Sequence, residues 1–396
     1  MTPFTKKINL KLLTRIDISS SIKVACTAAA IATAPITASA YSFKDSSGNV
    51  DFTVGGYAKL SAIYSDTDSG KITNELGRNI YLPSATPVGA GDSHQVLDLT
   101  ARESRINFKA KTEQGGHKMG MVLEMDFLGT TNGNEVVSNS YSPRMRHFFF
   151  TFDNWLFGQT WSTFMDTGAL AEAVDFLASP EGIVFIRQAQ VRYSSGDFQV
   201  ALENPESFVS GSNDRDVNTL PDLTANYKLK GGWGHMRLNG LLRLIEVDDP
   251  GVQESEAGYG VGVSGKIKVG STDDIRFSAN YGDGMGRYTS LGLVKDGILI
   301  NGKIETVKSV AATAAYHHAW NAKSRSNLIF SMADIDNPTG AAGTENKSSS
   351  SIQINYLYSP VKQVSYGIMY LAGERETENG DDGKLSRIQA TAKYSF

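Results

Sequence analysis

One stretch of the chain decides the fold class: Ser386-Arg387-Ile388-Gln389-Ala390-Thr391-Ala392-Lys393-Tyr394-Ser395-Phe396. Its even-numbered side chains from 388 onward are apolar or aromatic, and its odd-numbered ones are polar or charged. A strand of about 9–11 residues with one apolar and one polar face is the unit of an outer-membrane β-barrel. Lipid meets the apolar face and water meets the polar face, so the pattern already indicates a pore.

The first forty residues have the composition of a secretory signal peptide. A basic segment (Lys6, Lys7, Lys11, Arg15) precedes a short alanine-rich run at 24–36 and the small-residue site Ala38-Ser39-Ala40. A transmembrane anchor would need about twenty apolar residues, and this run is shorter. We therefore expect a signal peptide over residues 1–40, cleaved to leave a barrel over 41–396.

The charge of the expected mature chain argues against some partners. Residues 1–40 hold five basic residues, one acidic residue and the single cysteine, so the remainder has 33 basic and 41 acidic side chains, a net charge of −8. Neither this balance nor any clustered basic run favours nucleic acid as a partner. A secreted chain without disulfides must be held together in another way. No segment after residue 40 is apolar enough for a membrane helix, which is expected of barrels, since alternation dilutes their apolar residues.

The same two-residue alternation recurs along the chain in sixteen segments. We expect strands at about 54–62, 97–111, 118–127, 143–152, 154–161, 184–193, 198–203, 222–229, 236–244, 259–268, 275–281, 306–318, 324–332, 352–358, 366–370 and 386–396. Long connections at 65–96, 128–142, 162–183, 204–219, 246–257, 283–305, 333–347 and 375–384 alternate with seven short turns. The predicted fold is an all-β, sixteen-stranded antiparallel transmembrane barrel with long extracellular loops and short periplasmic turns.

A soluble β-sandwich or an extracellular adhesin is the alternative fold, because such sheets also alternate. Aromatic residues near the strand ends favour the barrel (Tyr57, Tyr64, Tyr193, Tyr227, Trp233, Tyr281, Tyr358). If the polar face of a strand met lipid instead of the apolar face, each basic residue near the midplane would cost up to roughly 2–4 kcal/mol. Sixteen strands leave an aqueous channel, whereas eight are filled by side chains.

The third long connection differs from the others in composition. It follows Trp161, contains Phe164 and Asp166, and carries a helix-like apolar run at Ala169, Leu170, Ala173, Val174 and Phe176. An apolar loop exposed outside the cell would be costly, so we expect it to fold inward and narrow the bore. A surface loop or a contact between subunits is the alternative.

Basic residues dominate the predicted inner face. Seven are candidates for the pore lining: Lys59, Arg102, Arg105, Arg144, Arg146, Arg187 and Arg192. A β-bulge near Arg102 and Glu103 would turn both Arg102 and Arg105 inward. Guanidinium groups stay charged and bind carboxylates through paired hydrogen bonds, so a cluster would attract anions. The alternative is a structural role, in which these arginines pair with Glu124, Asp126 or loop carboxylates.

Other chemistry is weakly signalled. The six histidines lack metal-ligand spacing, and most are expected at the surface or an interface. No Ser/His/Asp grouping indicates a hydrolase, and no motif indicates a cofactor or metal. Acidic loops at 334–338 and 381–383 have the ligands for calcium, but such loops are usually only solvated.

Several motifs resemble those of DcaP-like porins. They include Gly56-Tyr57-Ala58-Lys59-Leu60, Ala101-Arg102-Glu103-Ser104-Arg105, Arg187-Gln188-Ala189-Gln190-Val191-Arg192-Tyr193 and, most specific, Gly158-Gln159-Thr160-Trp161-Ser162-Thr163-Phe164-Met165-Asp166. The resemblance covers nearly all of residues 41–396. It implies an outer-membrane homotrimer with the third loop folded inward and a channel favouring small anions, especially dicarboxylates. It also places Arg102, Arg105, Arg187 and Arg192 in the basic lining, and Arg144 and Arg146 less directly.

Two departures bear on what the resemblance implies. Only about a dozen residues separate Tyr41 from the first strand, so the helical stalk of some members is not expected. Glu103 is acidic, which predicts partial neutralisation of the neighbouring arginines.

The sequence therefore favours a passive diffusion channel for small hydrophilic solutes that prefers di- or tricarboxylates. Its expected partners are such anions, outer-membrane lipid or lipopolysaccharide, and two further copies of the chain. The rivals are a general, weakly cation-preferring porin, as the net charge of −8 suggests, a barrel whose loops bind partners, and an outer-membrane hydrolase.

Overall fold

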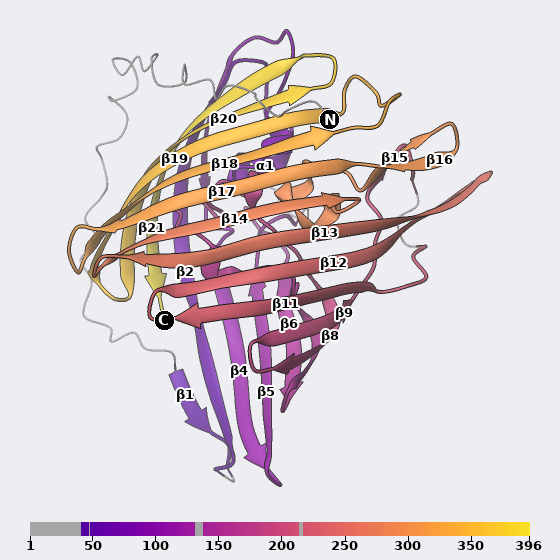
Figure 1. Ribbon diagram of the computed structural model, residues 1–396. Helices are drawn as coiled ribbons and strands as arrows, with labels where there is room; N and C mark the ends of the chain where they lie inside the picture. Colours follow the sequence, from indigo (N-terminus) through magenta and orange to yellow (C-terminus); the bar gives the residue numbers. More distant parts are fainter. Residues whose placement is uncertain (1–40, 47, 131–137, 214–216) are drawn as a thin grey trace. The chain divides into compact units, whose positions relative to one another are not determined.

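The computed structural model describes residues 41–46, 48–130, 138–213 and 217–396, so the expected signal peptide lies outside the described residues. The described strands close into an antiparallel barrel (Figure 1) of sixteen strands, when β3 and β4 are counted as one interrupted strand. The ring consists of β2 (Val50–Thr67), β3 (His94–Thr100), β4 (Arg105–Gln114), β5 (His117–Asp126), β6 (Arg144–Phe152), β7 (Trp155–Trp161), β8 (Arg187–Ser195), β9 (Phe198–Glu203), β11 (Asp222–Gly231), β12 (Gly234–Asp249), β13 (Val252–Val269), β14 (Asp273–Asp283), β17 (Lys308–Ala319), β18 (Ser324–Asp336), β19 (Asn346–Val361), β20 (Val364–Thr377) and β21 (Asp382–Ser395).

Closure of the ring comes from the pairing of the first and last strands. β2 pairs with β21 from Tyr57↔Ser395 to Thr67↔Leu385, and β9 pairs with β11 across the other side. A closed ring leaves no unpaired strand edge, which is a condition for crossing a bilayer with strands. The predicted fold class is confirmed. No helix among the described residues is long and apolar enough to cross a membrane.

The predicted irregularity in the second strand is also confirmed. The pairing of β2 with β3 ends at Ser61↔Thr100, and its pairing with β4 begins at Tyr57↔Arg105. Four residues, 101–104, thus lie opposite three on β2, which is one extra residue on the bulged side. Outside the ring, β1 (Tyr41–Lys44) forms a short hairpin with the start of β2.

Side chains alternate between the two faces of the wall as the sequence predicts. Leu60, Leu238 and Ile354 on the outer face are about half exposed, whereas Ser61 and Gln353 on the inner face are buried. The inner face is buried because loops fold into the barrel and pack against it. The apolar outer face is the one that lipid covers.

Two of the predicted long loops are mostly strand in the structure. Of residues 375–384, only 378–381 lie between β20 and β21. Residues 246–257 form mostly strand, because β12 and β13 pair without interruption up to Asp249↔Val252 around a two-residue turn. Backbone groups need partners on either side of the membrane boundary, and extending the hairpin supplies them. Polar residues such as Glu246 and Gln253 keep this extension soluble.

The helical conformation predicted for residues 169–176 is also wrong. That segment contains only the 3-10 turn η4 (Thr167–Ala169), and η5 (Pro180–Gly182) follows it. Carbonyl groups of this segment accept hydrogen bonds from the barrel wall in place of the i→i+4 bonds of a helix. The remaining helical elements are α1 (Glu75–Asn79), η3 (Pro83–Ala85), η6 (Gly286–Tyr288) and η7 (Ser290–Gly292).

Three connections fold inward and fill part of the bore. Loop one (68–93) brings Tyr81 against Leu371 of β20 and Val174 of loop three. Loop three (162–186) carries Phe164 and Met165 into an apolar cluster with Leu241 of β12. Loop six (284–307) contributes Met285 and Tyr288 to the same cluster. It also contains β15 (Gly297–Ile300) and β16 (Lys303–Thr306), which form a small sheet with β10 (Val209–Ser210).

Candidate functional site: an arginine-lined passage beside loop three

Loop three is attached to the inner wall through its backbone carbonyl groups. Side chains from many strands donate to these carbonyls, because the loop has few internal hydrogen bonds of its own. The donors are Arg192 to Trp161, Arg237 to Met165 (3.0 Å), Arg276 to Leu170 (2.5 Å), Asn355 to Glu172 (2.9 Å), Lys59 to Val174 (2.8 Å) and Asn280 to Gly182 (3.2 Å). The loop therefore follows the wall from β8 round to β2.

Two residues predicted for the constriction loop are anchors within this arrangement. The Asp166 carboxylate lies 2.8 Å from His235 Nε2 and accepts from Ser264 Oγ at 3.2 Å. Phe164 is buried and meets the ring of Tyr288 edge-on. Both residues fix the loop on the β12–β13 side of the barrel.

The far end of loop three is held by a buried carboxyl group. Glu181 accepts from the Tyr81 hydroxyl at 2.7 Å and from Ser351 Oγ at 2.8 Å. Burial raises the pKa of Glu181 to about 7, because removing water disfavours the charged form. This carboxyl therefore titrates near neutral pH while it is docked.

A charged contact supports the middle of the loop. Arg325 Nε donates to Glu172 Oε2 at 2.6 Å. Burial acts to raise the pKa of Glu172, but the bond to Arg325 outweighs it and holds that pKa below its ordinary value. Glu172 thus stays ionised and paired.

Three of the predicted arginines, on β4 and β6, form ion pairs with two carboxylates of β5. Arg146 bonds Glu124 at 2.9 Å and Asp126 at 2.8 Å, Arg144 bonds Asp126 at 2.8 Å, and Arg105 lies 3.3 Å from Glu124. Arg144 and Arg146 both reach inward, while Met145 between them is exposed on the outer face. A register shift between Glu124 and Met125 in the β5–β6 pairing then turns His147 inward as well.

Arg187, the first residue of β8, completes this group, and within the described part of the chain it forms no ion pair. Its guanidinium stacks 4.4 Å above the Trp161 ring and 5.4 Å from Phe185. One of its nitrogens, Nη1, is buried and has no hydrogen-bond partner among the described residues. Arg187 also interacts electrostatically with Arg146, Arg144 and Arg105, and Phe176 of loop three lies 5.3 Å from Arg146.

Exposure shows which part of the inner wall is open. Arg105 and Glu124 retain 18% and 17% of their side-chain area, and Arg144 retains 27%. Arg387, Gln353 and Gln389 on the β19–β21 side retain none. Free space therefore borders β4, β5 and β6. Arg276 of β14 and Arg325 of β18, which anchor loop three, also keep 20% and 24% of their side-chain area.

The other predicted lining residues lie outside this group. Lys59 pairs with Glu103 at 2.5 Å in a buried contact, and Glu103 also interacts electrostatically with Arg105. Arg102 pairs with Glu75 of α1 at 2.6 Å and stacks on Tyr141. Arg192 bonds Gln190 and the carbonyl of Trp161.

Sequence reasoning missed the inward path of loop six and the aromatic residues Phe176 and Phe185 beside the arginines. The signal for loop six was present, since the run 291–300 is apolar apart from Lys295 and Asp296, in a connection expected outside the cell. Two histidines, His147 and His235, are buried. The described residues contain no group of three side chains that would hold a metal ion.

The closed ring, its apolar outer face and its polar, loop-narrowed bore define an outer-membrane porin. A model of the DcaP outer membrane protein family matches residues 49–396, so the chain belongs to that family. The family and the fold are those of channels.

Solved structures share the fold. The outer membrane channel DcaP of Acinetobacter baumannii is 27% identical, with a TM-score of 0.75 over 89% of this chain and 99% of its own. An anion-selective porin from Comamonas acidovorans and Salmonella typhi OmpF are each 10% identical with a TM-score of 0.56, covering 88% and 90% of this chain and 100% of theirs. At 10% identity these two show the fold alone. No curated protein matched the chain.

Proposed function

We propose that this porin is a diffusion channel that prefers small anions, di- and tricarboxylates in particular. Solutes move down their own gradient through the passage bordered by Arg105, Arg144 and Arg187, with the buried Arg146 next to them. The observation that carries this proposal is the charge of that group. Four guanidiniums face two carboxylates, Glu124 and Asp126, which leaves a formal excess of two positive charges.

Local charge outweighs the net charge of the chain for an ion in the passage. The Debye length is about 10 Å at 0.1 M salt, so acidic residues in the outer loops are largely screened there. Low-dielectric walls focus the field of the arginines and raise the local concentration of anions.

Carboxylates suit these arginines better than simple halides do. Glu124 and Asp126 already occupy the donors of Arg144 and Arg146, whereas Nη1 of Arg187 has no hydrogen-bond partner among the residues that the structure describes. A carboxylate bound there gains hydrogen bonds as well as charge attraction. A second carboxylate on the same solute interacts with the neighbouring Arg105, which favours two-headed anions.

The variant Arg187→Gln tests the proposal. It removes the unpaired charge, so we expect a smaller anion preference, measured as the reversal potential in a salt gradient across a planar bilayer. Lys230→Gln is the charge-matched control, because Lys230 is exposed at the end of β11 and paired with Asp197 in a short turn. A wild-type reversal potential in the Arg187→Gln channel would contradict a role for Arg187 in anion preference. A cation-selective wild-type channel would favour the general, weakly cation-preferring porin that the net charge of −8 suggests.

Two further features belong to the proposal. Residues 1–40 are removed as a signal peptide, which N-terminal sequencing of the purified barrel tests. The barrel is a homotrimer in a membrane of lipid and lipopolysaccharide, which its mass in detergent tests. An OmpT structure from Vibrio cholerae with a related fold, 12% identical, is a trimer form.

A further inference from the structure

Loop six is joined to loop three inside the barrel by backbone hydrogen bonds. Val184 and Thr289 form an antiparallel bridge. The Phe185 amide donates to the Tyr288 carbonyl at 3.2 Å, and the Ser290 amide donates to the Ile183 carbonyl at 3.2 Å. Because these bonds are regular and buried, the two loops form one body.

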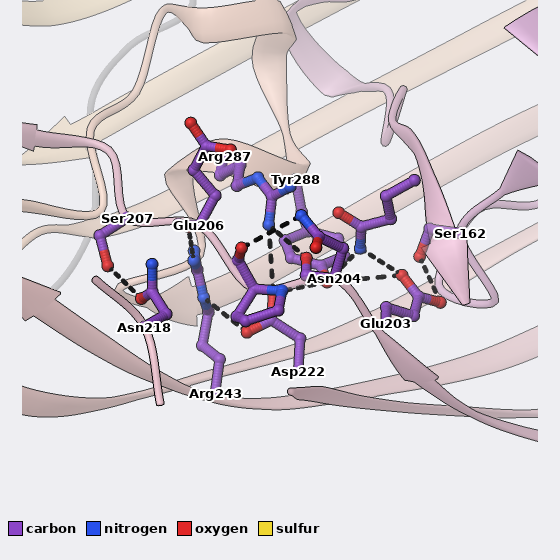
Figure 2. Close-up of polar contacts among 12 residues, drawn as sticks. Ser162, Glu203, Asn204, Glu206, Ser207, Asn218, Asp222, Arg243, Arg287 and Tyr288 are labelled. Carbon is purple, nitrogen blue, oxygen red and sulfur yellow. Dashed lines mark hydrogen bonds and ion pairs between the residues drawn. The ribbon is translucent and has the colours of Figure 1, made fainter. Parts of the chain in front are cut away.

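The Tyr288 side chain connects this body to the wall (Figure 2). Its hydroxyl donates to Asp222 at 2.8 Å and accepts from Gln188 at 2.7 Å. Gln188 also donates to Glu203 at 2.5 Å. The Tyr288 hydroxyl oxygen is therefore hydrogen-bonded to Gln188 of β8 and to Asp222 of β11. The Tyr288 ring packs against Phe164.

Glu203 carries the same network to the start of loop three. Its carboxylate accepts from the Thr163 amide at 2.7 Å, from Ser162 Oγ at 3.1 Å and from Thr224 Oγ1 at 2.6 Å (Figure 2 shows Ser162 and Glu203). Both ends of loop three are thus connected to Tyr288, one by backbone bonds and the other through Glu203.

A buried ion pair fixes the root of loop six. Arg243 of β12 bonds Asp296 at 2.7 Å, and both side chains are fully buried. Asp296 also accepts from the amides of Arg287 and Phe208 at 2.8 Å. The apolar part of the loop, with Leu293 and Val294, packs on Ala311 of β17 and Ala333 of β18.

We propose that loop six is a second constriction element, and that Tyr288 is the positioning residue that holds both loops on the wall. Together the loops occupy the β11–β21 side of the bore and confine solutes to the side of Arg105 and Arg144. The inference rests on solute passage through the bore. It concerns how wide the passage is, whereas the arginine proposal concerns which ions it prefers.

The variant Tyr288→Phe tests the inference, because it removes the hydroxyl and keeps the ring. A hydrogen bond to a charged acceptor shifts an equilibrium about tenfold or more, so the undocked fraction of the loops rises by that factor. We expect a higher single-channel conductance with more current noise and an unchanged sign of the reversal potential. The control is Tyr227→Phe on the exposed outer face.

A cross-link supplies the rescue. Bridge partners have Cα atoms within the range a disulfide spans, and the chain has no cysteine after residue 40. Adding Val184→Cys with Thr289→Cys to the Tyr288→Phe channel should restore wild-type conductance when oxidised and lose it when reduced. Wild-type conductance and noise in Tyr288→Phe overturn the inference. If that variant does not fold, the test is disulfide formation between Val184→Cys and Thr289→Cys in an otherwise wild-type chain. Failure to form the disulfide would show that the two loops are not joined.

Discussion

Basic side chains of the inner wall have two different roles, and position on the wall decides which. Lys59, Arg192 and Arg276 donate to carbonyl groups of loop three. Arg105 and Arg144 face the open side and meet only carboxylates of β5 among the described ion pairs. The same residue type therefore anchors a loop on one side of the bore and sets the electrostatic potential on the other.

Glu181 makes the docking of loop three dependent on pH. Its pKa rises from an ordinary 4.5 to about 7 on burial, so the docked loop binds the proton more tightly than the undocked loop does. Docking is therefore strongest below about pH 4.5 and weakens as the pH rises through about 7. We expect single-channel current noise to increase between about pH 5 and pH 8.

The variant Glu181→Gln isolates this effect from other titrations. It keeps a neutral, hydrogen-bonding group at every pH, so its current noise should not change over that range. Exposed Glu113→Gln is the charge-matched control and should behave as the wild type. A pH response that persists in Glu181→Gln contradicts the role given to this carboxyl group.

Among the elements, loop three depends on close contact with the wall. At Gly182 an added Cβ would overlap the backbone of Ala312 in β17. The Gly182 amide also donates to Ser331 Oγ at 2.8 Å. Only a residue without a side chain lets the loop approach the strand this closely.

We expect Gly182→Ala to lift this end of loop three from the wall. Overpacking of this kind costs roughly 1–3 kcal/mol, which is enough to undock the loop while the barrel stays closed. Single-channel conductance should become larger or more variable, and the barrel should keep its resistance to unfolding on unheated gels. Gly232→Ala in an open turn is the control, and equal conductance in the two variants would contradict the close contact.

At this scale the sequence predicted strands well and loops poorly. The alternation in β12, β19 and β21 has one cause, because lipid faces one side and polar groups the other. The path of loop three has many causes, namely donors such as Arg237 and Asn280 from strands far apart in the chain. An apolar run there indicated burial correctly, but its helical spacing was overridden by those donors. The candidate arginines were found, but which of them line the open side depends on that path.

The whole molecule combines two requirements. A closed ring satisfies every strand edge, as a bilayer demands, and sixteen strands enclose more space than side chains can fill. Loops one, three and six reduce that space. The open side is then bordered by β4, β5 and β6, where the arginines outnumber the carboxylates.

Ion selectivity of the wild-type channel tests this arrangement most directly. The measurement is the reversal potential in a salt gradient at neutral pH, repeated at low and high ionic strength. We expect an anion-selective sign that weakens at high salt, because the Debye length falls from about 10 Å at 0.1 M to about 3 Å at 1 M. A cation-selective sign at low salt would contradict it.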